Sequence, residues 1–419
     1  MAQFESLPVM TPSKLPWNAR RSRSVALAAA VALSALGCDG SSPPPTTPPL
    51  AGVSAVTAGG NHTCARLSDG TARCWGEDAF GELGDDASGG PGDATMETRP
   101  PGTPVMVGLP GIVALAAGGN QTCALLADAT VSCWGDNIWG ELGNGQRSLY
   151  DTTPAQVSGL TGVVAVAATG PSQDDSEVDD EFSCALLTSG QAFCWGNDGD
   201  GALGDGGSAV DVPSPVAVSG LTGATQLALG GGHACALLGD RTVTCWGNDL
   251  FISSATPTTV PGLSDVVELT TGSVHACALF VSGTVSCWGD HTFGQIGDGT
   301  TSPDLGTPPT PVAGLSGVTA ISAAGDHTCA LRGDGTVLCW GVDDHGQLGD
   351  GTVAELRAAP TPVKGLAGAI AISAGNQFSC ALLGDGTVRC WGENDSGQLG
   401  NGSQSTIDVP TPVTVVSGP

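Results

Sequence analysis

The sequence predicts an all-β fold, a seven-bladed β-propeller of four-stranded antiparallel blades closed by the C-terminal strand. Three observations support this prediction. One cysteine-containing unit recurs seven times, each copy reads as a series of short strands, and those strands carry bulky or apolar groups on both faces. We therefore expect the propeller to occupy residues 50–419.

The segment before the propeller, residues 1–37, has the pattern of an export signal. It is basic between Lys14 and Arg23, and an apolar run follows at Val25–Gly37. Such a run is too short to span a bilayer and is typical of a signal-peptide core. The ending Ala-Leu-Gly-Cys resembles a bacterial lipobox, which predicts lipidation of Cys38. An ordinary cleaved signal is the alternative.

Residues 38–49 are rich in Pro, Ser and Thr, and such tracts form extended, solvated spacers. We expect them to tether the propeller to the lipid. The predicted location is the outer membrane or cell surface of a bacterium, with a periplasmic or secreted protein as the alternative.

The repeat is defined by cysteines. Fourteen of the 15 fall into seven Cys-x9-Cys pairs, each followed by Trp-Gly, and the remaining one is Cys38. The pairs are Cys64 with Cys74, Cys123 with Cys133, Cys184 with Cys194, Cys235 with Cys245, Cys277 with Cys287, Cys329 with Cys339, and Cys380 with Cys390. A repeat of this regularity indicates stacked copies of one structural unit.

The last unit shows how each copy should fold. Three strands are predicted, at Ile370–Ser373, Gln377–Leu383 and Thr387–Trp391, with a tight Gly-Asp-Gly turn between the second and third. In this register Cys380 lies directly opposite Cys390, at a Cα separation of about 4.5–5.5 Å that a disulfide can span. Each pair should therefore bridge within one hairpin.

The third strand of this unit is bulky on both faces. Val388 and Cys390 point one way, whereas Arg389 and Trp391 point the other. A sheet with one wet face would not show this pattern. It is typical of a small sheet packed between two similar sheets, as in a propeller blade.

Runs that begin with Pro and end with Val predict a fourth strand. They are Pro104–Val107, Pro154–Val157, Pro215–Val218, Pro257–Val260, Pro311–Val312 and Pro362–Val363. The first unit has no such run before it. We therefore expect the C-terminal run Thr411–Val416 to join the blade of Cys64 and so close the ring.

The repeat resembles a known family. Residues 325–349 read GDHTCALRGDGTVLCWGVDDHGQLG, which is similar to the regulator-of-chromosome-condensation repeat, and the resemblance covers roughly residues 50–419. It implies a seven-bladed propeller that binds protein partners on its surface. The paired cysteines look like the variant found in exported bacterial members. After Trp246 the GQLG loop is missing, which predicts a shortened loop in that blade.

Charge excludes several functions. The chain has a net charge of −28, and residues 38–419 carry −31. Such a surface repels phosphate backbones and anionic membranes. We therefore expect no nucleic-acid partner, no nuclear exchange-factor role and no membrane contact except through the N-terminal lipid. We also expect a monomer.

One loop position predicts a binding face. The residue before the first Gly of each GxLG-type loop, or its equivalent, is aromatic or His at Phe80, Trp139, Phe251, Phe293 and His345. In equivalent blades these residues form a circle on one face, and aromatic clusters often mark recognition sites. A protein partner is the main prediction. A glycan partner, simple packing of the aromatics against the next blade, and a structural envelope protein are the alternatives.

Four histidines precede the first cysteine of their units by two residues. They are His62, His233, His275 and His327. A ring of imidazoles could bind a metal. Because Phe182 and Phe378 fill the same position in other units, packing is the preferred interpretation, and no metal site is expected.

Catalysis finds no support in the sequence, which lacks G-x-S-x-G, H-E-x-x-H and phosphate-loop motifs. We expect neither enzymatic activity nor a cofactor, and an enzyme with convergent carboxylates at the channel mouth is the alternative. The acidic insert Pro171–Glu181 is expected to be a solvated loop, with Ca²⁺ or a basic partner as the alternatives.

Overall fold

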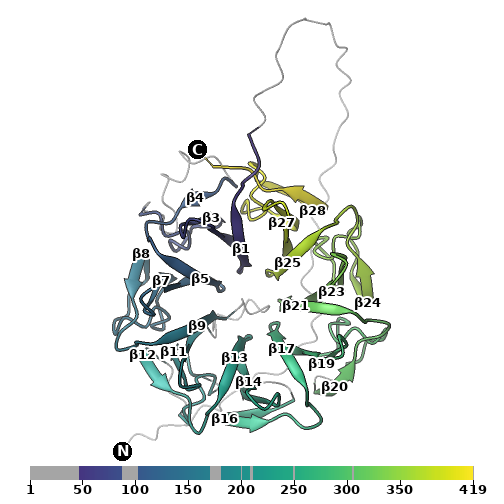
Figure 1. The fold of residues 1–419 in the computed structure, drawn as a ribbon. Coiled ribbons are helices and arrows are strands. Elements are labelled where there is room, and N and C mark those ends of the chain that lie inside the picture. The colour runs from purple at the N-terminus through teal and green to yellow at the C-terminus, as the bar shows by residue number, and fades with distance from the viewer. Residues whose placement is uncertain are drawn as a thin grey trace, which may run out of the picture. The chain divides into compact units, whose positions relative to one another are not determined.

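The computed structural model describes residues 47–86, 102–169, 181–199, 201–207, 211–248, 251–303 and 306–418. The predicted signal, Cys38 and most of the predicted tether lie outside these residues. Within them, seven sheets of four antiparallel strands surround a common axis (Figure 1). The predicted seven-bladed propeller is therefore confirmed.

Each blade uses four strands that are consecutive in the chain. Blade 1 contains β1 (Val53–Ala58), β2 (His62–Leu67), β3 (Ala72–Gly76) and β4 (Val105–Met106). Blade 2 contains β5 (Ile112–Ala117), β6 (Gln121–Leu126), β7 (Val131–Asp136) and β8 (Tyr150–Gln156). Blade 3 contains β9 (Val163–Ala168), β10 (Phe182–Leu187), β11 (Ala192–Gly196) and β12 (Val212–Ala217). Blade 4 contains β13 (Ala224–Leu229), β14 (His233–Leu238), β15 (Val243–Asn248) and β16 (Ser253–Thr259).

The remaining blades repeat the same order. Blade 5 contains β17 (Val266–Thr271), β18 (His275–Phe280), β19 (Val285–Gly289) and β20 (Thr307–Pro311). Blade 6 contains β21 (Val318–Ala324), β22 (His327–Arg332), β23 (Val337–Val342) and β24 (Leu356–Pro362). Blade 7 contains β25 (Ala369–Ala374), β26 (Phe378–Leu383), β27 (Val388–Asn394) and β28 (Ser405–Thr414). The first strand of each blade lies innermost and the fourth lies at the rim (Figure 1).

The paired cysteines are opposed in all seven hairpins, as predicted. Cys380 is the register partner of Cys390, and the other six pairs have the same pairing. All seven pairs form disulfides, with Cα–Cα distances of 4.0–4.1 Å. Each bridge therefore joins the second and third strands of one blade.

The hydrophobic core lies between blades, which explains why both sheet faces are apolar. The seven Trp residues of the Cys-Trp-Gly motifs are fully buried. Trp134 of blade 2, for example, packs with Cys64, Cys74 and Leu83 of blade 1. Gly84 of blade 1 has φ +65°, and a side chain at this position would collide with the Trp134 indole. The close approach of neighbouring blades thus requires glycine here.

The expected position of the C-terminal strand is wrong. β28 pairs with β27 of its own blade, and β4 completes the blade that contains Cys64. Each fourth strand follows its hairpin instead of preceding it, so every unit is complete and no strand is exchanged. The chain ends still meet, because Leu50 N donates to Val415 O (2.9 Å) and Pro49 bridges to Val416.

Among the described residues, no helix has the length and apolar character needed to cross a membrane.

Candidate binding face

The loops that follow the third strands share a self-bonded turn. In blade 1, Asp78 Oδ1 accepts a hydrogen bond from Leu83 N (3.1 Å), and Glu82 Oε2 accepts one from Phe80 N (2.8 Å). The Glu82 carbonyl accepts a further hydrogen bond from Trp134 Nε1 of blade 2 (2.7 Å). The loop is therefore fixed both internally and to the next blade.

The tryptophan hydrogen bond recurs around the ring. The other indole donors and carbonyl acceptors are Trp195 with Glu141, Trp246 with Ala202, Trp340 with Gln295, Trp391 with Gln347, and Trp75 with Gln398, at 2.7–2.9 Å. The last of these joins blade 7 to blade 1, so this seam has the same contact as the others.

Blade 4 is the exception, as the sequence predicted. Its third and fourth strands are separated by only four residues, between Asn248 and Ser253, and the GxLG turn is missing. The buried Nε1 of Trp288 in blade 5 consequently has no hydrogen-bond partner within the described structure.

The five predicted binding-face positions are all partly exposed, and all lie in loops at the same end of the blades. Phe251 differs from the others, because it packs against the core cluster that contains Trp288 and Ile252. At Trp139, Phe293 and His345 the backbone N–H is held by the side chain two residues later, as at Phe80. A fixed backbone thus presents each of these four side chains.

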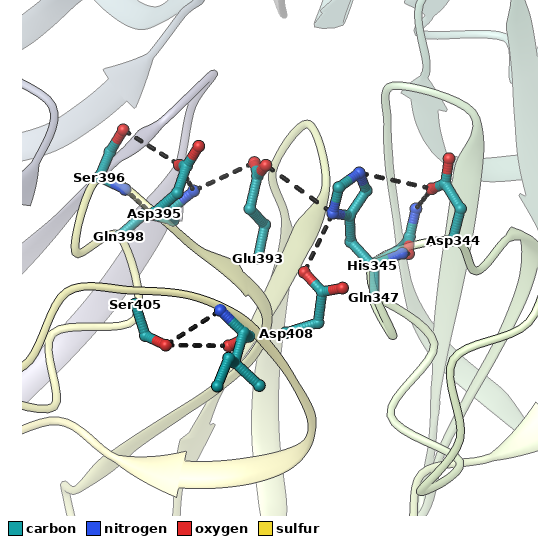
Figure 2. Close-up of polar contacts among 10 residues, drawn as sticks. Asp344, His345, Gln347, Glu393, Asp395, Ser396, Gln398, Ser405 and Asp408 are labelled. Atoms are coloured by element: carbon teal, nitrogen blue, oxygen red, sulfur yellow. Dashed lines mark hydrogen bonds and ion pairs between the residues drawn. The ribbon is translucent and has the colours of Figure 1, made fainter. Parts of the chain in front are cut away.

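His345 lies in a polar cluster at the seam between blades 6 and 7 (Figure 2). Its Nδ1 is 3.0 Å from Asp408 Oδ1 and 3.8 Å from Glu393 Oε1, and its Nε2 is 4.0 Å from Asp344 Oδ1. With its amide nitrogen facing them, Gln377 donates to His345 Nε2 (3.2 Å) and to Glu393 (3.1 Å). One imidazole is thus surrounded by three carboxylates.

The pKa values of Glu393 and His345 in this cluster are both raised. Burial raises the pKa of Glu393 to about 7, and the negative charge of Asp395 adds to the effect. Burial opposes protonation of His345, but its hydrogen bond to Asp408 and the surrounding carboxylates outweigh this and raise its pKa. The surroundings thus favour the protonated form of both groups.

Other carboxyl groups on the loop face also have raised pKa values. Burial is the main cause in each, and it raises the pKa to about 8 at Glu82 and Glu141 and to about 7 at Asp326 and Asp343. At the opposite ends of the blades, Asp residues in the hairpin turns have lowered pKa values because Thr side chains donate hydrogen bonds to them. These are Asp69, Asp128, Asp240, Asp334 and Asp385. The buried carboxyl groups of the loop face thus favour the protonated form, whereas these hairpin-turn carboxylates favour the ionised form.

One group of carboxylates could hold a metal ion. One ligand atom each from Asp136, Glu141 and Glu181 lie within 4.8 Å of one another, and all three residues are buried. Glu181 Oε1 also accepts a hydrogen bond from Asn120 N (3.0 Å). The expectation of a solvated insert is therefore wrong for Glu181, because this residue belongs to the turn before β10. Residues 171–180 lie outside the described structure.

Three of the four histidines at the predicted position contact the next blade, whereas neither ring nitrogen of His233 has a hydrogen-bond partner in the described structure. His62 Nε2 is 2.8 Å from Thr122 Oγ1 of the next blade, and the same distance separates His275 from Thr328 and His327 from Ser379. Burial lowers the pKa to about 4 at His62 and His327 and to about 3 at His275. These neutral imidazoles join adjacent blades.

Fold and loop pattern together define a disulfide-bridged repeat β-propeller. The RCC1-like domain family matches residues 175–418, and the regulator of chromosome condensation (RCC1) repeat matches residues 53–82 and 112–146. The chain therefore belongs to the RCC1-like family, which confirms the resemblance seen in the sequence.

Individual relatives agree with this family. Protein pim1 of Schizosaccharomyces pombe is 30% identical over 345 residues, which cover 72% of this chain and 62% of that protein. The human E3 ubiquitin-protein ligase HERC2 is 29% identical over 316 residues, covering 73% of this chain but 5% of the ligase. The chain thus spans only part of these relatives.

Solved structures show the same fold. Prp20p of Saccharomyces cerevisiae superposes with a TM-score of 0.68 at 23% identity, covering 87% of each chain. Human WBSCR16 superposes with a TM-score of 0.66 at 22% identity, covering 82% of this chain and 92% of that one.

Proposed function

We propose that this chain is an exported, lipid-anchored propeller that binds a protein partner through its loop face and catalyses no reaction. RCC1-like propellers are scaffolds, so the function must be argued from the face and not from the fold. The observation that carries the proposal is the presentation of Phe80, Trp139, Phe293 and His345, partly exposed, on turns fixed by their own hydrogen bonds. Aromatic side chains held in this way lose little entropy on binding.

The buried carboxylates with raised pKa values do not require a catalytic role. Glu82 and Glu141 each accept a backbone N–H of their own loop, and Gln295, Gln347 and Gln398 make the same contact in other blades. Since an amide that cannot act as an acid serves equally well, this position stabilises the loop.

Alanine replacement of three aromatic residues tests the binding face. The F80A/W139A/F293A variant should lose at least about tenfold of its affinity for a partner captured from the native cell envelope, because binding energy concentrates in buried aromatic anchors. Capture by pull-down and the melting temperature would both be measured. The control is V281A/I370A, which removes side chains that are 57% and 60% exposed away from the loop face.

The control variant should capture the partner as the wild type does. A triple variant that folds with a wild-type melting temperature and still captures the partner would contradict the proposal. A triple variant that melts far below the wild type would show that the aromatics serve packing.

Export is supported by the seven disulfides, because such bridges persist in oxidising compartments. Lipid attachment predicts that the mature protein begins at a diacylated Cys38. Mass spectrometry of the protein from a bacterial host should find the acylated N-terminal peptide, and C38S should abolish both the modification and membrane fractionation. A free thiol at Cys38 in the wild type would contradict lipidation.

A further inference from the structure

Three acidic residues come from neighbouring segments on the loop face, between blades 5 and 6. Asp290 directly follows β19, Asp326 directly precedes β22, and Asp344 lies in the loop after β23. Val342 N, two residues before Asp344, donates to the Asp326 carbonyl (3.0 Å), and Ser273 N donates to the Gly325 carbonyl (2.8 Å). Asp290 N donates to the carbonyl of Val274, the residue after Ser273 (2.9 Å). We call these three residues the acidic seat.

Asp326 is the unusual member of the acidic seat. The residue is only 9% exposed, and its Oδ1 is fully buried without a hydrogen-bond partner. Burial, together with the charges of Asp290 and Asp344, raises its pKa to about 7. A buried carboxylate with no donor is costly, and proteins normally pair such a group with a cation or a hydrogen-bond donor.

Among the described residues, no salt bridge joins a basic side chain to Asp326. Arg357 pairs with Asp350, Arg147 with Asp211 and Arg241 with Asp265. Arg66 donates to the Ile112 carbonyl and Arg73 to the Pro104 carbonyl. The imidazole of His345 lies between Asp408 and Asp344 (Figure 2), with Nδ1 hydrogen bonded to Asp408 and Nε2 4.0 Å from Asp344, so it contacts the seat at Asp344 and has no hydrogen bond or ion pair with Asp326 in the described structure.

We propose that the acidic seat receives a lysine or arginine side chain of the protein partner. The inference rests on the proposed binding function and names the chemistry of the partner. The Asp344 side chain is 28% exposed and adjoins His345, so the seat is reached from the same face as the predicted partner contacts. A basic side chain can extend a long apolar stem and place its charge against buried carboxylates.

The net charge of the chain supports this choice of partner. Residues 38–419 carry −31, which draws basic proteins to the surface at long range. Long-range attraction would act over the whole surface, whereas the seat would select one basic side chain. The test must therefore separate local from general attraction.

The test uses a pair of variants with the same change in charge. D326N/D344N removes two charges from the seat, and D334N/D385N removes two from the hairpin face. Asp334 and Asp385 each accept their turn's Thr N–H through Oδ1, which asparagine also provides. The probe is a short acetylated, amidated peptide with one central arginine, and the matched control peptide carries citrulline, the neutral isostere.

NMR titration should show arginine-peptide binding that falls at least tenfold in D326N/D344N and less than twofold in D334N/D385N. The citrulline peptide should not bind. An equal loss of affinity in both variants would mean that the peptide is attracted by the overall negative charge and not by the seat, and would overturn the proposal. Binding of Ca²⁺ at Asp326 without binding of the arginine peptide would also overturn it, because the occupant would then be an inorganic ion.

This assay uses no partner, so its outcome is independent of the capture experiment. Loss of capture in the aromatic variant with no arginine binding at the seat would preserve the proposed function and refute the seat. Arginine binding at the seat with unchanged capture in the aromatic variant would do the reverse.

Discussion

At one position of the loop after the third strand, a Glu or a Gln side chain makes the same hydrogen bond in different blades. Glu82 and Glu141 occupy the place that Gln295, Gln347 and Gln398 take in other blades, and all five accept the backbone N–H two residues earlier. Burial raises the pKa of the two glutamates to about 8, so they remain largely protonated at neutral pH and resemble the amides.

This comparison predicts the effect of E82Q/E141Q. The folded pKa lies above the unfolded value of 4.5, so the contribution to stability is complete below that value and is lost as the pH rises through about 8. Denaturant unfolding should therefore give similar stabilities for wild type and variant at pH 4, below the unfolded pKa. At pH 9 the variant should be more stable by about 1 kcal/mol or more, since each pKa unit corresponds to about 1.4 kcal/mol.

Titration of the buried histidines contributes little to the change in the free energy of unfolding between pH 7 and pH 9. Burial lowers the pKa of His62 and His327 to about 4 in the folded state, below the ordinary 6.5, so their contribution is complete above that pH. Between pH 7 and pH 9 the carboxyl groups dominate the slope. A wild-type protein whose stability does not fall over this range would contradict the assignment of buried, protonated glutamates.

The loop after the third strand of blade 4 differs from the others, because in the described structure it offers no carbonyl acceptor to the tryptophan of the next blade. Trp340 Nε1 donates to the Gln295 carbonyl (2.9 Å), whereas Trp288 faces the shortened loop of blade 4 and has no partner in the described structure. W340F should be more destabilising than W288F by about 1–3 kcal/mol, because only the former leaves a buried carbonyl unpaired. Both replacements remove similar apolar area.

Thermal and urea unfolding of the two variants would measure the difference. Equal destabilisation would mean that the indole N–H groups contribute nothing at either seam. A larger loss in W288F would mean that the shortened loop supplies an acceptor after all.

Hairpin elements were predictable because their determinants are local. The nine-residue spacing and a short turn are enough to place Cys380 opposite Cys390, and the same logic holds in every unit. The neighbours of His345 were not predictable, since Asp408 is 63 residues away and comes from another blade. Nor was the burial of Asp326 and Glu181, because adjacent blades determine whether a turn residue is covered.

At the scale of the whole molecule, the blade count followed from the repeat but the unit boundary did not. A cyclic repeat has the same pattern wherever it is cut, so a fourth strand before or after the hairpin satisfies the sequence equally well. The long connection between β3 and β4 separates Val105 from Cys74 in the sequence, although the two residues are register partners in the sheet. This separation in sequence led to the assignment of Pro104–Val107 to the following unit, and so to the wrong position for β28.

The closure of the ring bears on how the order of the blades in the sequence can change. Every blade is encoded by one uninterrupted stretch, and the two ends meet through Pro49 and Val416 at an ordinary seam, where Trp75 bonds to blade 7 as its counterparts do elsewhere. The strand pairing of the propeller therefore does not depend on which seam separates its first blade from its last. A rearranged gene that opens between any other two blades would still encode seven intact sheets, and evolution could add or remove a blade without separating a strand from its disulfide-bonded hairpin.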